Sequence, residues 1–220
     1  MFNTLIKGEN VIIEPNVQIG RYVRIYDNVI IKSGTIIGDF VQIGYKELQN
    51  NNITLIDEDV RIRSGAVIYH NCKIGRGSSI GHNSVIRENT IIGDNTYIGA
   101  LVMMEGDTIV GNYCAINAQC HITKYSSMGD FTFFGPSVVS TNDNNMAHKR
   151  QGHGQNMKGF TIDKYVRVGG GTIFLPGVSL GEGCIIGAQS IISKDIPAYK
   201  VAYGSPAKII RDATKDEIVL

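Results

Sequence analysis

A six-residue period runs along almost the whole chain and constrains its fold more than any other feature of the sequence. A small or β-branched residue recurs at every sixth position in three runs, which begin at Val11, Val60 and Val166. Two residues after each of these positions, 24 of 25 residues are Ile, Val, Leu, Met or Phe, and Ser140 is the single exception. The next position is most often Gly. Such regularity over 220 residues indicates a repeat protein.

Each six-residue unit predicts one short strand followed by a turn. A small residue, an outward residue and a large aliphatic residue alternate as in a strand, and Gly permits the backbone angles of a turn. A strand this short cannot bury its apolar face alone, so the units are expected to stack as a solenoid with a continuous interior. The small inward position also holds all four cysteines, which are therefore expected to pack in the interior without disulfides: Cys72, Cys114, Cys120 and Cys184.

This pattern of small residue, outward residue, large aliphatic residue and glycine resembles the hexapeptide-repeat family. The resemblance implies an all-β fold, a left-handed parallel β-helix with three hexads in each triangular coil. Neither the handedness nor the coil length follows from the period alone. The 25 hexads then give about eight coils. Members of the family associate as trimers with active sites between subunits, which implies a homotrimer here.

Two interruptions of the period predict protruding loops. They lie at about residues 45–56 and 141–161, and the second is rich in Asn, Gly, His and Lys. A loop of that length in a compact protein is usually functional or disordered, so the second is expected to be an active-site arm, with a tolerated surface insertion as the alternative. The β-helix is expected to span residues 1–196, and residues 197–220 to form a cap with a short helix from about Pro206.

Charge and hydropathy exclude several classes of partner. With 21 basic and 20 acidic residues, the chain lacks the one-sided positive charge that nucleic-acid or anionic-membrane binding needs. No apolar run approaches the roughly 20 residues of a spanning helix, and the N-terminal residues lack the apolar core of a signal peptide. The expectation is a cytoplasmic protein with no nucleic-acid or membrane partner.

One outward column is more apolar than a solvent-facing surface usually is. The column is spaced by 18 residues and consists of Val67, Val85, Met103, His121 and Val139. Large apolar patches mark interaction sites, so this column favours a subunit interface. His121 is therefore expected at the interface or in the site rather than free on the surface.

Four C-terminal motifs resemble, in order and spacing, the coenzyme A site of sugar acyltransferases of this family. They are VGGG at 168–171, IGAQS at 186–190, SKDIP at 193–197 and VAYGSPAKIIRD at 201–212. The resemblance implies acyl-coenzyme A as co-substrate, with the backbone of Gly170 near the thioester and that of Ala188 near the pantetheine. The residues expected around the phosphate-bearing nucleotide end are Ser193, Lys194, Lys208 and Arg211. Solvated charges on a closing helix are the alternative for the last two.

The arm lacks a histidine where family members that acetylate a sugar hydroxyl carry their general base. That place holds Asn144, and His148 lies four residues later. A hydroxyl needs a base near neutral pH, whereas an unprotonated amine is already a nucleophile. The departure therefore favours N-acylation. O-acetylation with His148 or His121 as base is the alternative.

The stretch VVSTND at 138–143 resembles N-acyltransferases that modify amino groups on nucleotide-linked sugars. The chain also resembles the enzymes that act on dTDP-4-amino-4,6-dideoxyglucose, including one of the anthrose pathway, although no single motif separates the 3-amino from the 4-amino position. The resemblance implies a nucleotide-linked amino-deoxy sugar, of the dTDP-linked kind, as acceptor. The residues expected to bind it are Asn142, Asp143 and His148. A zinc-dependent hexapeptide protein would need three histidines around the metal, and the spacing of the five here provides no such triplet, so no metal is expected. A non-catalytic scaffold would leave the C-terminal motifs unexplained.

Two carboxylates depart from the repeat and, with His121, are the candidate catalytic residues. Glu105 occupies a corner position that is Gly in both flanking hexads, and Asp94 follows a Gly at a different corner. The structural alternatives are a stacked salt bridge between Glu105 and Arg87 and an ordinary turn aspartate at Asp94. Corners of one coil lie about 16 Å apart. The two carboxylates of one chain are therefore not expected to share a proton, although neighbouring chains of a trimer could bring them together.

Overall fold

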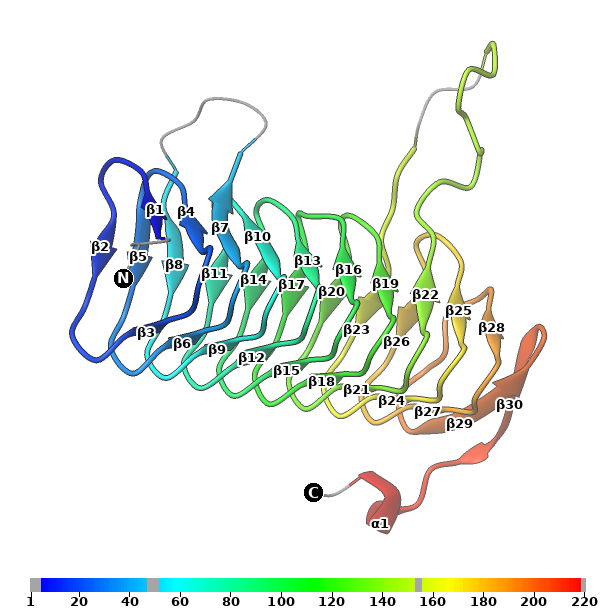
Figure 1. Ribbon diagram of the computed structural model, residues 1–220. Coiled ribbons are helices and arrows are strands. Elements are labelled where there is room, and N and C mark those ends of the chain that lie inside the picture. Colours follow the sequence, from blue (N-terminus) through cyan, green and yellow to red (C-terminus); the bar gives the residue numbers. More distant parts are fainter. Residues whose placement is uncertain (1–4, 47–51, 153–155, 219–220) are drawn as a thin grey trace.

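The computed structural model describes residues 5–46, 52–152 and 156–218, and in these ranges the chain winds as a solenoid of three sheets (Figure 1). Up to β28, strands that pair are three apart along the chain, and all pairs within the coils are parallel. Paired outward residues of the regular coils are 18 apart, as in Val85 and Met103. This is the stacked repeat that the six-residue period predicts.

Among the described residues, the three sheets contain ten, nine and eleven strands and are called sheets A, B and C. Sheet A consists of β1 (Ile6–Lys7), β4 (Arg24–Ile25), β7 (Gln42–Tyr45), β10 (Val67–Tyr69), β13 (Val85–Ile86), β16 (Met103–Met104), β19 (His121–Ile122), β22 (Val139–Ser140), β25 (Ile173–Phe174) and β28 (Ile191–Ile192). Sheet B consists of β2 (Ile12–Ile13), β5 (Val29–Ile31), β8 (Thr54–Ile56), β11 (Lys73–Ile74), β14 (Ile91–Ile92), β17 (Ile109–Val110), β20 (Ser127–Met128), β23 (Thr161–Ile162) and β26 (Ser179–Leu180). Sheet C consists of β3 (Gln18–Ile19), β6 (Ile36–Ile37), β9 (Arg61–Ile62), β12 (Ser79–Ile80), β15 (Tyr97–Ile98), β18 (Ala115–Ile116), β21 (Phe133–Phe134), β24 (Arg167–Val168), β27 (Ile185–Ile186), β29 (Lys200–Gly204) and β30 (Ala207–Asp212).

The solenoid has about ten turns instead of the expected eight, as the ten strands of sheet A in the described part of the chain indicate. Each stretch expected as an insertion, 45–56 and 141–161, ends in a strand of sheet B, β8 or β23. The inward residue before β23 is Phe160, which is fully buried where the repeat elsewhere has a small residue. The hexad pattern missed this unit because it required a small or β-branched side chain there.

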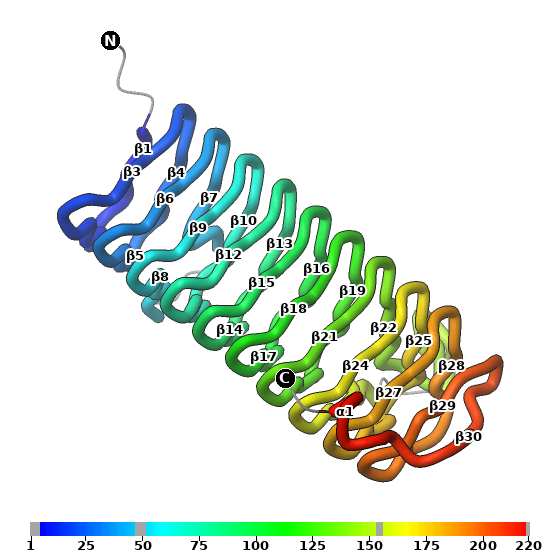
Figure 2. The backbone as a smooth tube through the Cα atoms, turned by 90° about the horizontal axis from the view of Figure 1, so that it is seen from below, coloured from blue at the N-terminus to red at the C-terminus, as the bar shows by residue number. Residues whose placement is uncertain are grey.

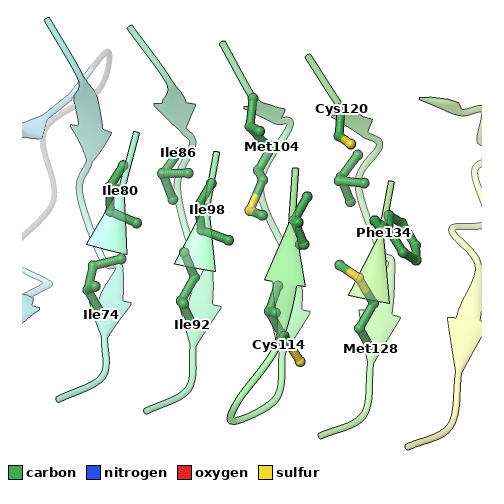
Figure 3. Packing of buried hydrophobic residues seen from close by; sticks show 14 of the residues in the cluster. Ile74, Ile80, Ile86, Ile92, Ile98, Met104, Cys114, Cys120, Met128 and Phe134 are labelled. Carbon is green, nitrogen blue, oxygen red and sulfur yellow. The ribbon is translucent and has the colours of Figure 1, made fainter. Parts of the chain in front are cut away.

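The interior is filled by the large residue of each hexad, and these side chains stack in columns along the axis (Figure 3). The middle coils contribute a run of fully buried isoleucines, Ile74, Ile80, Ile86, Ile92 and Ile98. Burying one such side chain stabilises the fold by about 1.5–3 kcal/mol relative to leaving it exposed. Stacking of coils is thus the main source of stability.

All four cysteines are buried and free, as predicted from their inward positions. Burial raises the pKa of the Cys72 thiol to about 12 and those of Cys114 and Cys120 to about 11. The pKa of Cys184 is also raised by burial. A thiol with so high a pKa is not a nucleophile near neutral pH, so these side chains act as small apolar residues.

The C-terminal end is closed by an antiparallel hairpin of β29 and β30, followed by the short helix α1 (Lys215–Ile218) (Figure 2). The expected helix start at about Pro206 is wrong, because residues 207–212 form β30. Ile209 and Ile210 are β-branched and favour a strand, and β30 has β29 as a pairing partner. Of the described residues, none belongs to a helix long and apolar enough to cross a membrane.

Candidate active site

Sheet A brings Glu105 and His121 into contact. His121 begins β19 and pairs in register with Met103 of β16, so Glu105 lies diagonally across from the imidazole on the outer face. His121 Nε2 is 2.9 Å from Glu105 Oε1, and 43% of the histidine side chain and 34% of the glutamate side chain are exposed. The two candidates form a hydrogen-bonded dyad that a ligand can reach.

The hydrogen bond determines which ring nitrogen of His121 can accept a proton. An ionised carboxylate only accepts hydrogen bonds, so in the neutral ring Nε2 carries the hydrogen and Nδ1 keeps its lone pair. Nδ1 has no hydrogen-bond partner within the described ranges. A histidine oriented by a carboxylate in this way is suited to act as a general base.

The alternative salt bridge between Glu105 and Arg87 does not form between these described residues. Arg87 Nε donates to Glu88 Oε2 at 3.0 Å, and its guanidinium lies over the Tyr69 ring at 5.4 Å from the centroid. Lys124 lies 3.1 Å from Glu88 and completes the local pairing of charges. The Glu105 carboxylate is consequently left to His121.

Asp94 lies at the corner between sheets B and C and is not part of the dyad. Its Oδ1 accepts the backbone N–H of Arg76 at 2.9 Å, and its own N–H donates to Asn112 Oδ1 at 2.8 Å. Asp130 continues the series by accepting the N–H of Asn112 at 2.7 Å. The Asp94 side chain thus belongs to a ladder of turn-stabilising hydrogen bonds, which is the structural alternative given for it above.

The arm between β22 and β23 protrudes from the solenoid (Figure 1). Asp143 accepts the backbone N–H groups of Asn145 and Ala147, both at 2.9 Å, and these bonds hold the pKa of its carboxyl below the usual range. The Asn142 carbonyl accepts the N–H of Lys158 at 2.8 Å, which closes the base of the arm. His148 is exposed. No hydrogen bond joins the described part of the arm to the dyad, so the substrate-binding roles of these residues stay predictions.

Gly170 and Ala188 stack at the corner between sheets C and A. Gln189 N–H donates to the Gly170 carbonyl at 2.9 Å, and a Cβ at position 170 would lie 2.9 Å from the Pro136 carbonyl oxygen. Such a contact is shorter than real Cβ atoms show, so the close approach of these turns requires glycine at 170. Ala188 is exposed on this corner.

The residues expected at the nucleotide end of coenzyme A are divided between two places. Ser193 and Lys194 are exposed at the corner that follows β28 of sheet A. Lys208 and Arg211 lie on β30 of the closing hairpin. One chain does not bring these four side chains into one cluster, and their role in binding stays a prediction.

Arg211 has a partner within its own chain that the sequence did not indicate. Its two terminal nitrogens donate to the Glu217 carboxylate at 2.8 and 2.7 Å. Hydrogen bonds from Arg211 and from the Thr214 backbone lower the pKa of Glu217 to about 2. Lys208 lies opposite Tyr203 in the hairpin.

The contact between Glu105 and His121 is the part of the site that sequence reasoning missed, although both residues were candidates. Glu105 and His121 are 16 residues apart in the sequence, two fewer than the 18 residues of one regular coil. Outward residues so spaced are diagonal neighbours on one sheet face, which is the signal that could have found the pair. Among the described residues, no group of three or more His, Cys, Asp or Glu side chains is arranged to hold a metal ion.

Three stretches of the chain, residues 10–45, 53–88 and 89–124, match the family described as bacterial transferase hexapeptide (six repeats). A galactoside O-acetyltransferase of Lactococcus lactis subsp. lactis (strain IL1403) is 37% identical over 87 residues, which are 38% of this chain and 42% of that protein. The matched stretches of the curated relatives cover between 24% and 42% of their length.

Solved structures share the fold. A galactoside acetyltransferase in complex with coenzyme A is 26% identical, with a TM-score of 0.52 over 58% of this chain and 66% of that one. A UDP-N-acetylglucosamine acyltransferase of Francisella novicida is 18% identical, with a TM-score of 0.57 over 99% of this chain and 75% of that one, a likeness of fold alone. The repeat match and the stacked coils together show that the chain is built of hexapeptide repeats and folds as a left-handed parallel β-helix.

Proposed function

We propose that the protein is an acyl-coenzyme A-dependent acyltransferase that acylates the amino group of a nucleotide-linked amino-deoxy sugar. The observation that carries this proposal is the Glu105–His121 dyad, a half-exposed base held by a carboxylate on the outer face of sheet A. The acyl donor is supported by the galactoside acetyltransferase of similar fold, which holds coenzyme A. A sugar acceptor is supported by the name of the Lactococcus lactis relative.

In the proposed reaction, the amine nitrogen attacks the carbonyl carbon of the thioester, and one amine proton passes to His121 Nδ1. Glu105 keeps the ring oriented through Nε2 and interacts favourably with the positive charge that the ring gains. The carbon–sulfur bond then breaks, and the thiolate of coenzyme A takes the proton back from His121. The products are the amide and the free thiol, and the imidazole ends neutral.

The arm favours an amine over a hydroxyl as the acceptor. Asn144, and not a histidine, occupies the place where O-acetylating family members carry their base, and His148 is exposed. An unprotonated amine needs only positioning and an acceptor for its surplus proton. The resemblance of VVSTND to N-acyltransferases that modify amino groups on nucleotide-linked sugars supports such a sugar as the acceptor.

O-acylation of a sugar is the second candidate, and the dyad itself is the observation that favours it. A histidine hydrogen-bonded to a carboxylate can remove the proton of a hydroxyl, so His121 would serve as base in that reaction as well. His148 is a weaker base candidate, because no carboxylate within the described residues orients it.

We propose further that the protein is a homotrimer and that sheet A faces a neighbouring subunit at the active site. The apolar outward column of sheet A pairs in register from Val67 to Val139 and continues with Ile173 and Ile191. Sheet B also has exposed apolar outward residues, with Ile91 and Ile109 at 44% and 52%, but Lys73 interrupts its outward column, which is polar from Ser127 onward. The column of sheet A is favoured as the interface because it contains the dyad.

The proposed reaction is tested by measuring thiol release from acetyl-coenzyme A with a dTDP-amino-deoxy sugar and with the corresponding hydroxy sugar nucleotide. Thiol release at least about tenfold faster with the amine, and its loss in His121→Ala, is the expected result. His148→Ala is the matched control and should retain activity. Faster release with the hydroxy sugar would replace the proposal by O-acylation, and no release with either acceptor would overturn the proposed acceptor class.

A further inference from the structure

A cavity of about 180 Å³ opens at the corner between sheets C and A, in the N-terminal half of the solenoid. It is lined by Arg61, Arg63, Ser64 and His82, together with Ile36 and Gly38. The repeat assigns no role to Arg61, Arg63, Ser64 and His82, because each occupies an outward or corner position.

The strand order explains why two guanidinium groups share this cavity. Arg61 is the outward residue of β9 and lies in register between Ile36 of β6 and Ser79 of β12. Arg63 follows two residues later, so both side chains leave the same side of the chain. His82 comes from the corner after β12 and contributes a third group that can carry positive charge.

The cavity has a floor that depends on glycine. A Cβ at position 38 would lie 2.7 Å from the Ser64 backbone nitrogen and 2.8 Å from its hydroxyl oxygen. Gly38 therefore packs directly against Ser64, and a side chain at position 38 would displace the Ser64 hydroxyl that lines the cavity. Backbone and hydroxyl groups of a tight corner are suitable donors to a small anion.

No acidic side chain within the described residues neutralises the two arginines. Neither Arg61 nor Arg63 forms a salt bridge there. The nearest acid of the same corner, Asp39, accepts the backbone N–H of Arg21 at 2.7 Å. Glu58 is engaged by Arg76 at 2.9 Å. The lining of the cavity thus carries two guanidinium groups and no carboxylate.

We propose that this cavity is a phosphate subsite that binds the diphosphate of the nucleotide-linked acceptor. Guanidinium groups match phosphate oxygens with paired, charge-assisted hydrogen bonds, and His82 and Ser64 add further donors. The identity of the ligand as an acceptor diphosphate rests on the proposed function. The anion site itself rests only on the cavity and its charges.

The register relates this subsite to the dyad. The corner at His82 leads directly into β13, and β13 pairs with β16, after which Glu105 follows. His121 of β19 is therefore two strand spacings from the coil of His82, about 10 Å along the axis, and three from the coil of Arg63, about 15 Å. A diphosphate in the cavity can extend its sugar along sheet A toward the dyad.

Coenzyme A is a less suitable occupant of this cavity. At the same corner, five coils separate Ser64 from Gly170, where the family resemblance expects the thioester, which corresponds to about 24 Å along the axis. The basic residues expected at the nucleotide end of coenzyme A lie still further toward the C-terminus, on β30. The acceptor is the ligand whose phosphates reach this end of sheet A.

The test is calorimetric titration of the full-length protein with inorganic pyrophosphate, dTDP and coenzyme A, each as a separate probe. In Arg61→Ala/Arg63→Ala, affinity for pyrophosphate and dTDP should fall at least about tenfold, while affinity for coenzyme A should change less than about twofold. Arg21→Ala is the matched control, because it removes the same charge from the same corner outside the cavity. A single Arg63→Gln variant with wild-type thermal unfolding provides the comparison if the double variant is unstable.

Unchanged affinity for pyrophosphate and dTDP, an equal loss in Arg21→Ala, or a loss confined to coenzyme A would each overturn the subsite. Failure of the subsite is distinguishable from failure of the proposed function. Acyl transfer to a sugar nucleotide with an unchanged KM in the double variant refutes the subsite alone. Arginine-dependent binding of pyrophosphate without acyl transfer to any sugar nucleotide refutes the proposed reaction alone.

Discussion

Two corners of the β-helix hold the carboxylates that depart from the repeat, and the structure employs them differently. At the corner between sheets B and C, Asp94 accepts the backbone N–H of Arg76 in the coil before it. At the corner after sheet A, Glu105 makes its hydrogen bond to the side chain of His121 in the coil after it. One carboxylate stabilises the turn ladder, and the other orients a base.

The difference between Asp94 and Glu105 shows that side-chain length decides the role of a carboxylate that departs from the hexad pattern. An aspartate carboxyl is short enough to reach the backbone of the adjacent turn, and the same bond recurs at Asp27, Asp39 and Asp130. The longer glutamate passes the turn and reaches the outward column of sheet A, where His121 stands among apolar residues. A functional carboxylate can thus be identified by a hydrogen bond to a side chain, here His121, instead of the recurring bond to the backbone of the adjacent turn.

The largest effect is expected from a charge placed in the outward column of sheet A, beside the dyad. Met103→Glu should convert the proposed trimer to monomers, because a buried, unpaired carboxylate costs several kcal/mol, about enough to dissociate an interface. Activity should fall to background if the site lies between subunits. Sedimentation velocity measures the assembly, with Ile109→Glu on sheet B as the matched control that stays trimeric. A stable wild-type monomer, or dissociation by the control alone, would contradict the assignment of sheet A.

The next largest effect concerns the base itself. His121→Ala should lower kcat about 10²- to 10⁴-fold, because the attacking group loses its proton acceptor. The KM for acyl-coenzyme A should change little, since the imidazole acts on the acceptor rather than on the donor. Steady-state thiol release with the amino sugar measures both constants. Wild-type kcat in His121→Ala, or an equal loss in His148→Ala, would remove His121 from the mechanism.

The contrast between the two corners is tested directly by a pair of isosteric variants. Glu105→Gln should lower kcat about tenfold or more, because an amide can donate to Nε2 and favour the wrong tautomer of His121. Asp94→Asn should leave kcat within about twofold, because Asn112 already makes the same turn bond one coil later. Equal losses in both variants would mean that the turn ladder, too, contributes to the chemistry.

Most of the fold could be predicted from the sequence, because the hexad pattern dictates the inward side of every strand. The pattern failed where its own rule was too narrow. Phe160 fills a position where the pattern requires a small residue, so the pattern does not predict the start of the coil that contains β23. The polarity of residues 207–212 predicts a helix, whereas β-branched Ile209 and Ile210 and the open edge of β29 favour strand pairing.

Less of the site could be predicted, because contacts between outward side chains depend on their length and direction. The sequence identified Glu105 and His121 separately, but the diagonal contact needs the register of β16 and β19. It also could not show that Glu217 engages Arg211, since that contact depends on where the chain turns after β30. Side-chain partners across coils follow from three-dimensional placement rather than from the period.

A smaller effect is expected when the turn bond of Asp94 is removed altogether. Asp94→Ala leaves the Arg76 N–H without its side-chain acceptor and should destabilise the protein by about 0.5–1.5 kcal/mol. For a chain of this size that corresponds to a decrease in Tm of about 2–4 °C per kcal/mol. Asp94→Asn is the control and should keep the wild-type Tm in thermal unfolding. A loss of kcat without a change in Tm would reverse the roles assigned to the two corners.

The smallest effect is expected on the KM for acyl-coenzyme A, from two basic residues of the closing hairpin. Like the two carboxylates, Arg211 and Lys208 differ in their partners within the chain. Arg211 is held by Glu217, and because the Glu217 pKa is lowered to about 2, that pairing is present at neutral pH and is lost only as the pH falls through about 2. Lys208 makes no ion pair within the described residues and is free to contact a phosphate. Lys208→Ala should therefore raise the KM for acyl-coenzyme A about two- to fivefold with little change in kcat, as expected for the loss of one exposed ion pair. Arg211→Ala should change it less, and Glu217→Gln should lower it by releasing the guanidinium. An unchanged KM in both Lys208→Ala and Glu217→Gln would show that the hairpin does not contact the donor.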